Sequence, residues 1–448
     1  MLGNNTKSML KISNKMRGMN HSLRNTSCLF NQQFKRQFLT SSINGQQCRN
    51  ASTSDIASTS LKKKKDSKFY SFCQTQFPNK FKVGECNIVE ELFSAESQKL
   101  CFSEISKRSV VTVEGEHSDS FIHSLVTSDV SKKLIVRDET KKNLPTHSSQ
   151  PSLFLSPKGR VLFDAILSVE FESDGSLKNN RKIYIEHEAS QTEHLYNYLK
   201  SHVLRKKVKI EKFSNNFQST TTTTSEGPIV KVFALFGNKI LKSRKPDLQY
   251  KWKDSVVCVK DPRIPTLGYR IYGFFSNQEQ YEQFKHDVSA ELSKKLLVDT
   301  ESAEYYERIR LLSGIAENSV DIPSDSAFPM ESGFEQIGGI HFGKGCYVGQ
   351  ELTNRTFHRG EIRKRIVIIK GDKLPEAGSD LQFTGSNTEE LRSDKAGRMC
   401  SRDEQVGLAT VKFEPLLEKD STLELSFTNS QDGSTNTLKI VPPYWLAL

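Results

Sequence analysis

The 448-residue sequence contains no long apolar run and no closely paired cysteines. A membrane-spanning helix needs about 18 or more apolar residues in succession, whereas runs such as 230–236 are already broken by Lys231. The eight cysteines include no C-x-x-C pair and no two at zinc-finger spacing. We therefore predict neither a membrane-embedded protein nor a stably bound metal held by the protein's own cysteines.

Acidic residues are also missing from the first 54 positions, which hold eight lysines and arginines and carry a charge of +8. Residues 55–68 add five lysines and two aspartates, or +3, so these two segments account for the whole net charge of +11. The rest of the chain sums to zero. This neutral body argues against nucleic acid as a partner.

The basic leader has the pattern of an amphipathic helix. Its apolar residues are spaced three and four apart and share one helical face: Met9, Ile12, Met16, Met19 and Leu23. An acid-free, basic amphipathic N-terminus rich in Ser and Asn is typical of a mitochondrial presequence; the alternative is a disordered basic tail. We predict that residues 1–68 are presequence and linker, and that the protein acts in the mitochondrial matrix, where thiols stay reduced.

Beyond the leader, the pattern predicts an α+β protein that ends in a small β-barrel-like domain. A strand at 109–113 turns at Gly115 into a helix over 119–126 that Ser118 would cap, and 138–151 reads as a loop. A low-complexity insertion lies near 215–227. The other expected strands are 153–155, 161–169, 229–236, 255–260, 381–384, 406–412, 422–428 and 436–441, and the other expected helices are 193–204, 277–297 and 304–313.

The segment 338–351, G-G-I-H-F-G-K-G-C-Y-V-G-Q-E, is the densest in chemistry. Its five glycines let the backbone approach a ligand or another segment closely. Lys344 lies two residues from Cys346, so we expect the cation to stabilise the thiolate and increase its reactivity. Gln350 and Glu351 are expected to begin a helix. The simpler alternatives are a small buried cysteine and, around His358, a solvated basic face.

The string K-G-C-Y-V-G-Q-E (344–351) resembles the signature of the YgfZ branch of the glycine-cleavage T-protein (GcvT, aminomethyltransferase) superfamily. The following L-T-N-R-T-F-H-R-G resembles its mitochondrial members. Three other segments are similar to family blocks in the same order, 115–130, 156–164 and 260–270. The resemblance implies a three-domain cloverleaf around a central folate-sized cavity. Residues 69–366 would form the folate-binding-like region, in two subdomains, and 367–448 the C-terminal β-barrel.

For function, the resemblance implies a matrix factor that assists assembly or insertion of four-iron clusters into aconitase-type and radical-SAM enzymes, such as biotin and lipoyl synthases. Its partners would be A-type carrier proteins and client apo-enzymes. Cys346 and Lys344 are the candidate reactive residues, with Cys346 transiently holding sulfur, iron or a partner thiol. The candidate motif and partner-binding residues are Gly345, Tyr347, Gly349, Gln350, Glu351, Arg355 and His358.

The same resemblance leaves two alternatives open. One is a tetrahydrofolate-dependent one-carbon transferase in which Asp164 binds the pterin N–H donors and Arg310 pairs with the folate glutamate tail. Arg310 equally suits an ordinary helix-end salt bridge. Phe163 stands where similar proteins carry a second acid, and 265–270 lacks the acids of a T-protein, so we favour a maturation factor without aminomethyltransferase activity. The other alternative is a purely structural interaction module.

Overall fold

The computed structural model describes residues 100–130, 147–170, 181–215, 228–237, 252, 255–293, 298–299, 303–384, 395–412, 424–428, 433–441 and 443. The predicted presequence and linker (1–68), nearly all of the 215–227 insertion and the first four cysteines lie outside these residues. The chain divides into two compact units, and every described residue belongs to the unit Glu91–Pro443. No helix in the described part is long and apolar enough to cross a membrane.

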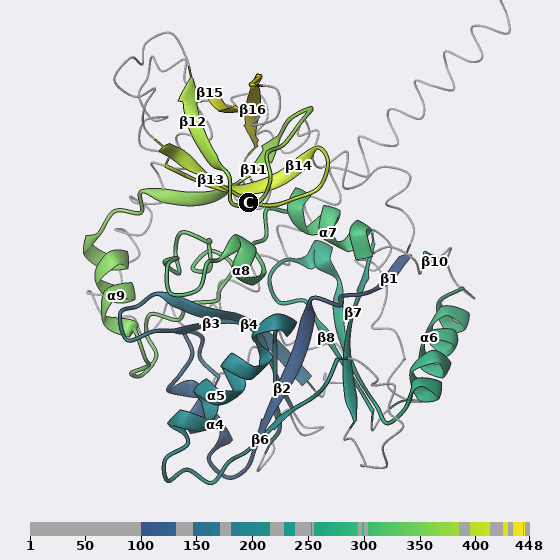
Figure 1. Cartoon of the computed structure of the whole chain (residues 1–448). Coiled ribbons are helices and arrows are strands. Elements are labelled where there is room, and N and C mark those ends of the chain that lie inside the picture. Colours follow the sequence, from purple (N-terminus) through teal and green to yellow (C-terminus); the bar gives the residue numbers. More distant parts are fainter. Residues whose placement is uncertain are drawn as a thin grey trace, which may run out of the picture. The chain divides into compact units, whose positions relative to one another are not determined.

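The described strands form two five-stranded sheets and one closed six-stranded barrel (Figure 1). The first sheet has the order β3 (His147–Leu155), β4 (Val161–Glu170), β5 (Ile183–Glu188), β2 (Arg108–Glu114), β6 (Lys209–Lys212). The second has the order β10 (Val298–Asp299), β1 (Leu100–Glu104), β7 (Ile229–Phe236), β9 (Tyr269–Phe275), β8 (Val256–Lys260). The barrel has the order β11 (Lys364–Lys370), β14 (Val406–Lys412), β13 (Lys395–Arg402), β12 (Asp380–Thr384), β15 (Glu424–Thr428), β16 (Thr435–Val441).

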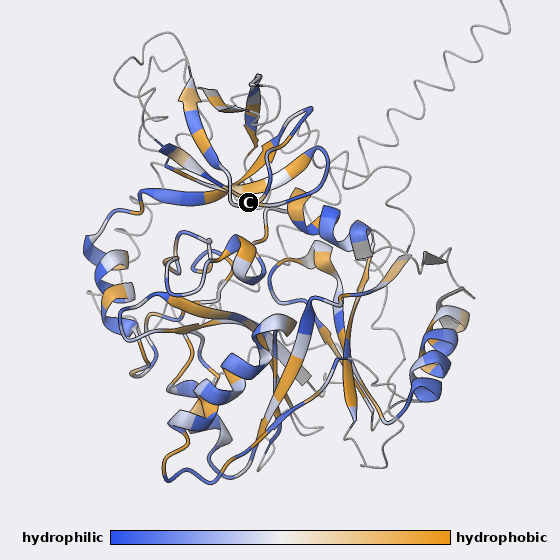
Figure 2. Cartoon of the chain, viewed as in Figure 1, coloured by the Kyte–Doolittle hydropathy of each residue, from blue (hydrophilic) through white to orange (hydrophobic). Residues whose placement is uncertain are grey.

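The helices are short and lie between these strands in the sequence. They are α4 (Ser118–His123), α5 (Thr192–His202), α6 (Gln278–Ser293), α7 (Ala303–Leu312), α8 (Asn318–Asp321) and α9 (Gln350–Arg359), with short 3₁₀ turns η2 (Ala189–Gln191) and η4 (Pro265–Leu267). In α6, Tyr281, Phe284 and Val288 recur on one face and join the core of the second sheet. The rest of α6 is mostly hydrophilic (Figure 2), so this helix covers the sheet with a single apolar stripe.

The α+β class and the C-terminal barrel are confirmed, and β7 has the predicted bounds. Two barrel strands, β11 and β13, were missed; in β13, glycine and interspersed charges obscure the period. The predicted cap is wrong: His117 is the N-cap residue without a side-chain bond, and Ser118 Oγ donates instead to the Arg181 carbonyl (3.1 Å). The predicted loop 138–151 is wrong at its end, because β3 begins at His147 and includes Pro151. A proline is tolerated there since β3 is an edge strand.

Candidate functional site

The glycine-rich loop lies against the turn that follows α4. The backbone N–H of His341 donates to the Thr127 carbonyl (2.9 Å), and that of Val348 donates to the Ser124 carbonyl (3.2 Å). The Thr127 hydroxyl donates to the Gly339 carbonyl (2.6 Å). Two segments singled out in the sequence, 115–130 and 338–351, are therefore brought together by main-chain bonds at both ends of the loop.

The ammonium of Lys344 is directed toward the end of α4. It donates to three backbone carbonyls, those of His123 (2.6 Å), Val126 (2.6 Å) and Ser128 (2.7 Å). An ammonium has three N–H donors, so these bonds use all of them. Burial lowers the pKa of Lys344 to about 7, an effect that nearby Asp129 opposes. Lys344 is therefore an inward anchor of the loop, and its effect on the Cys346 thiolate stays a prediction.

The far end of the loop packs on the β3–β4 turn. Gly349 is the N-cap residue of α9 and has φ 79°. A Cβ at Gly349 would lie 2.6 Å from the Ser156 carbonyl oxygen, and one at Gly159 would lie 2.9 Å from Leu352 Cβ. Only glycine fits such left-handed, crowded positions. The S-P-K-G-R turn and the K-G-C-Y signature are therefore in direct contact, and the predicted helix start at Gln350 is confirmed.

Cys346 itself is exposed, whereas Cys101, Cys258 and Cys400 are buried. The alternative that Cys346 is a small buried residue is therefore wrong. Its neighbour Gly345 is exposed as well, and His123 Nε2 lies 3.8 Å from the point that a Cβ on Gly345 would occupy. The other ring nitrogen of His123, Nδ1, lies 3.4 Å from Asp129 Oδ1. Within the described residues, no three His, Cys, Asp or Glu side chains are grouped so as to hold a metal ion.

Helix α9 extends the site as a polar surface. Arg355, His358 and Glu351 are exposed, and Arg355 donates to Glu351 Oε1 (2.6 Å) one turn earlier. The rings of Phe342 and Phe357 stack with centroids 3.7 Å apart, and the His358 ring meets both edge-on.

Tyr347 points inward and is buried, and burial raises its pKa to about 12. Gln350 is half-buried. The predicted partner-binding residues thus divide into an exposed helical face and an inward support.

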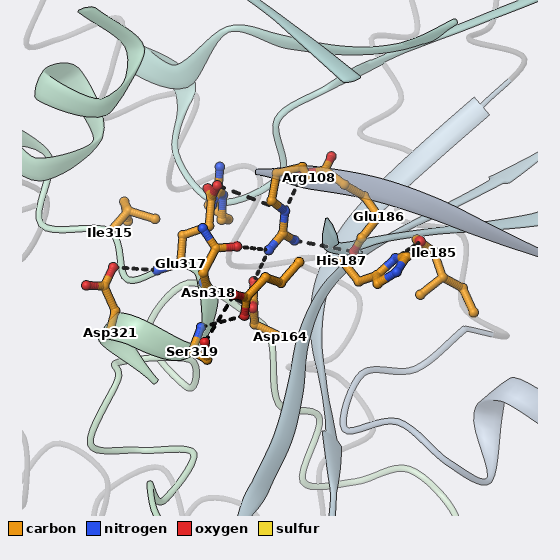
Figure 3. A network of polar contacts seen from close by, with 12 residues as sticks. Arg108, Asp164, Ile185, Glu186, His187, Ile315, Glu317, Asn318, Ser319 and Asp321 are labelled. Atoms are coloured by element: carbon orange, nitrogen blue, oxygen red, sulfur yellow. Dashed lines mark hydrogen bonds and ion pairs between the residues drawn. The ribbon is translucent and has the colours of Figure 1, made fainter. Parts of the chain in front are cut away.

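Asp164, one of the two predicted folate residues, belongs to a buried ionic network (Figure 3). Arg108 Nη1 donates to Asp164 Oδ2 (2.8 Å) and to Asn318 Oδ1 (2.8 Å). The other oxygen of Asp164 accepts from the Asn318 backbone N–H (3.1 Å), and Arg108 Nε donates to Glu186 Oε1 (3.1 Å). Burial raises the pKa of Asp164 although Arg108 opposes the shift. Through these buried hydrogen bonds, the Asp164 carboxylate on β4 connects β2 with α8.

Glu317 is the second node of this network. Its Oε2 accepts from Arg263 Nη1 (2.6 Å), Arg270 Nη2 (3.1 Å) and the Tyr306 hydroxyl (2.8 Å). Burial would raise the pKa of Glu317, but the surrounding guanidinium groups, Arg263 foremost, hold it well below its usual range. Asp261 accepts two bonds from the Arg263 side chain (3.0 and 2.7 Å) and one from Arg270 (3.1 Å). The 260–270 block therefore serves internal ion pairs.

Arg310, the other predicted folate residue, is 1% exposed. It donates to both carboxylate oxygens of Glu307 (3.0 and 2.6 Å), to Asp321 Oδ2 (2.6 Å) and to the Ile315 carbonyl (2.5 Å). Its charge is balanced inside the protein, as the salt-bridge alternative required. Asp164 and Arg310 as placed here do not fit a bound tetrahydrofolate, and the central cavity implied by the resemblance stays a prediction.

Several of these functional groups were missed in the sequence. Arg270 lies in the otherwise uncharged strand β9, and a charge in such a run is a signal of a buried ion pair; Glu186 lies in the more polar β5 and gives no such signal. His123 carries no such signal, because its proximity to Gly345 depends on a contact between segments about 220 residues apart.

No family model matches the chain. Among solved structures, the chain is similar to the glycine cleavage system aminomethyltransferase T from Bartonella henselae, with a TM-score of 0.55 and 13% identity over 78% of this chain and 86% of that one. The fold is therefore that of the GcvT-type aminomethyltransferases, as predicted; at this identity the likeness concerns the fold alone.

Similarity in sequence points to a more particular group. The chain is 28% identical over 347 residues to the mitochondrial iron–sulfur cluster assembly factor IBA57 homologue of Coccidioides immitis, covering 72% of this chain and 74% of the relative. It is 26% identical over 352 residues to the mitochondrial iron–sulfur cluster assembly factor IBA57 of Mus musculus, covering 77% and 85%. Its homologues are thus named as mitochondrial iron–sulfur cluster assembly factors, the chain itself has a GcvT-like fold, and the predicted resemblance is confirmed.

Proposed function

We propose that the protein is a mitochondrial matrix factor that assists the assembly and insertion of four-iron clusters into aconitase-type and radical-SAM enzymes. The names of its homologues support the general role. The observation that carries the proposal is Cys346, an exposed thiol beside an exposed glycine and just ahead of an exposed polar helix. A thiolate is the usual protein ligand of iron–sulfur clusters.

In this proposal the cluster is cargo that Cys346 ligates transiently. A transient ligand must reach both the donor and the acceptor protein, so it has to be exposed. The glycines beside it allow a partner's backbone to come close. Arg355 and His358, exposed on α9, would contact an A-type carrier or a client apo-enzyme.

The test is Cys346→Ser in cells lacking the native protein. Because the side chain is exposed, the variant should fold and accumulate normally, yet aconitase and lipoate-dependent dehydrogenase activities should stay low. A mitochondrial enzyme without clusters is the control enzyme, and Glu193→Gln, at an exposed ion pair on α5, is the control variant. Normal cluster-enzyme activities at equal protein levels would refute a role for this thiol.

The second candidate function, a tetrahydrofolate-dependent one-carbon transferase, is favoured by the fold of the solved relative. It is weakened because Asp164 and Arg310 are both committed to buried ion pairs. Disturbed glycine and one-carbon metabolism with unchanged cluster enzymes would favour it.

A further inference from the structure

The K-G-C-Y signature has inward residues at both ends and outward residues between them. Lys344 and Tyr347 are buried, whereas Gly345 and Cys346 between them are exposed. The Lys344 ammonium also lies 4.9 Å from the centre of the Tyr347 ring, a distance at which a cation is attracted to an aromatic face. The two inward side chains therefore hold each other, and the two residues between them form a small arch at the surface.

The inner end of the arch is fixed by backbone. The three carbonyls that receive the Lys344 ammonium belong to the last residue of α4, His123, and to the turn that follows it, Val126 and Ser128. Carbonyls at a helix end have no partner within the helix, and a buried carbonyl without a partner is costly. The Lys344 ammonium satisfies all three acceptors, so three hydrogen bonds in different directions fix its position.

The anchor also involves the residue whose side chain lies beside Gly345. The carbonyl of His123 is one of the three acceptors, while the imidazole of the same residue faces Gly345 and contacts Asp129. Asp129 is buried and lies close enough to favour the charged form of Lys344. Contacts therefore hold both the backbone carbonyl and the imidazole of His123 beside the arch.

We infer that Lys344 is a positioning residue for Cys346: seated on the three carbonyls at the end of α4, its ammonium holds the Gly345–Cys346 arch in one orientation. This inference rests on the proposed function of Cys346. Gly345 gives the arch a wide range of backbone conformations, so without the anchor the thiol would occupy many positions. A fixed ligand loses less conformational freedom when a partner binds, and hence binds more productively.

The experiment uses the full chain, apo-aconitase and a cluster-loaded A-type carrier protein, with aconitase activity as the readout at varied concentrations of the chain. Lys344→Met keeps the length of the side chain but has no donors, and it should reduce the rate at low concentration by about tenfold or more. Lys344→Ala should behave similarly. Added propylammonium supplies the missing three carbons and the nitrogen but is not joined to the backbone, so it should not restore the rate. Lys200→Ala, at an exposed lysine on α5, is the matched control.

Amide hydrogen exchange separates positioning from general unfolding. In both Lys344 variants, exchange should accelerate in 123–128 and 343–348, while the barrel strands stay protected as in the native protein. Wild-type rates in Lys344→Met would overturn the inference, and so would an Ala variant that recovers with propylammonium, because the charge alone would then suffice. Full activity of Cys346→Ser would instead show that the proposed function of the thiol is wrong.

Discussion

Replacing Glu317 with Gln removes one negative charge from the buried network and leaves its volume unchanged. In the native protein, Arg263 and Arg270 donate to Glu317 Oε2, and Arg108 Nε lies 4.0 Å from Oε1. All three guanidinium groups are at most 4% exposed. Removing one partner from a buried ion pair costs about 3–5 kcal/mol, because the remaining charges cannot be hydrated. We expect Glu317→Gln to lower the free energy of unfolding by that amount at pH 7.5.

The assay is urea denaturation followed by circular dichroism, with Glu193→Gln as the control. That residue pairs with Lys212 at the surface, where both side chains are at least 40% exposed, so its loss should cost less than about 1 kcal/mol. A Glu317→Gln variant within about 1 kcal/mol of the native protein would refute the view that this network stabilises the fold.

The effect of pH on this difference has a definite sign. The folded pKa of Glu317 is lowered well below its ordinary 4.5, so its stabilising contribution is complete above pH 4.5 and is lost as the pH falls through the folded pKa. The difference between native and variant should therefore be constant at neutral pH and should shrink only below 4.5. A difference that vanished already near pH 6.5 would point to a histidine instead.

Two further predictions follow from buried groups. Arg310→Met should lower the free energy of unfolding by about 3–5 kcal/mol and leave any tetrahydrofolate affinity measured by equilibrium dialysis unchanged; lost affinity at native stability would restore the folate role. His187 is buried, and burial lowers its pKa to about 3, so protons bind the unfolded chain preferentially between that pH and about 6.5, and stability should fall as the pH drops through this range. His187→Gln should flatten that slope in urea denaturation, and an identical slope would show that other groups are responsible.

The sequence determined much of the local structure and the identity of the key loop. Apolar runs such as Ile229–Phe236 specify buried strands because few alternatives bury so many β-branched and aromatic side chains. Gly349, directly before the polar residues of α9, marked the start of that helix in the sequence. Its φ of 79° in the structure is one that glycine adopts readily. The K-G-C-Y string singled out Cys346 because it resembles a family signature, and the structure places that thiol at the surface.

Only the tertiary structure decided which way each polar side chain points and which charges meet. Lys344 follows Gly343 and precedes Gly345, so nothing local fixes its direction; the three carbonyls that receive it come from about 220 residues away. Arg310 and Asp164 are equally suited to a ligand or to an internal partner, and their partners Asp321 and Arg108 come from other elements of the fold. Ion pairs act through space over a few ångströms, and sequence spacing carries no record of that distance.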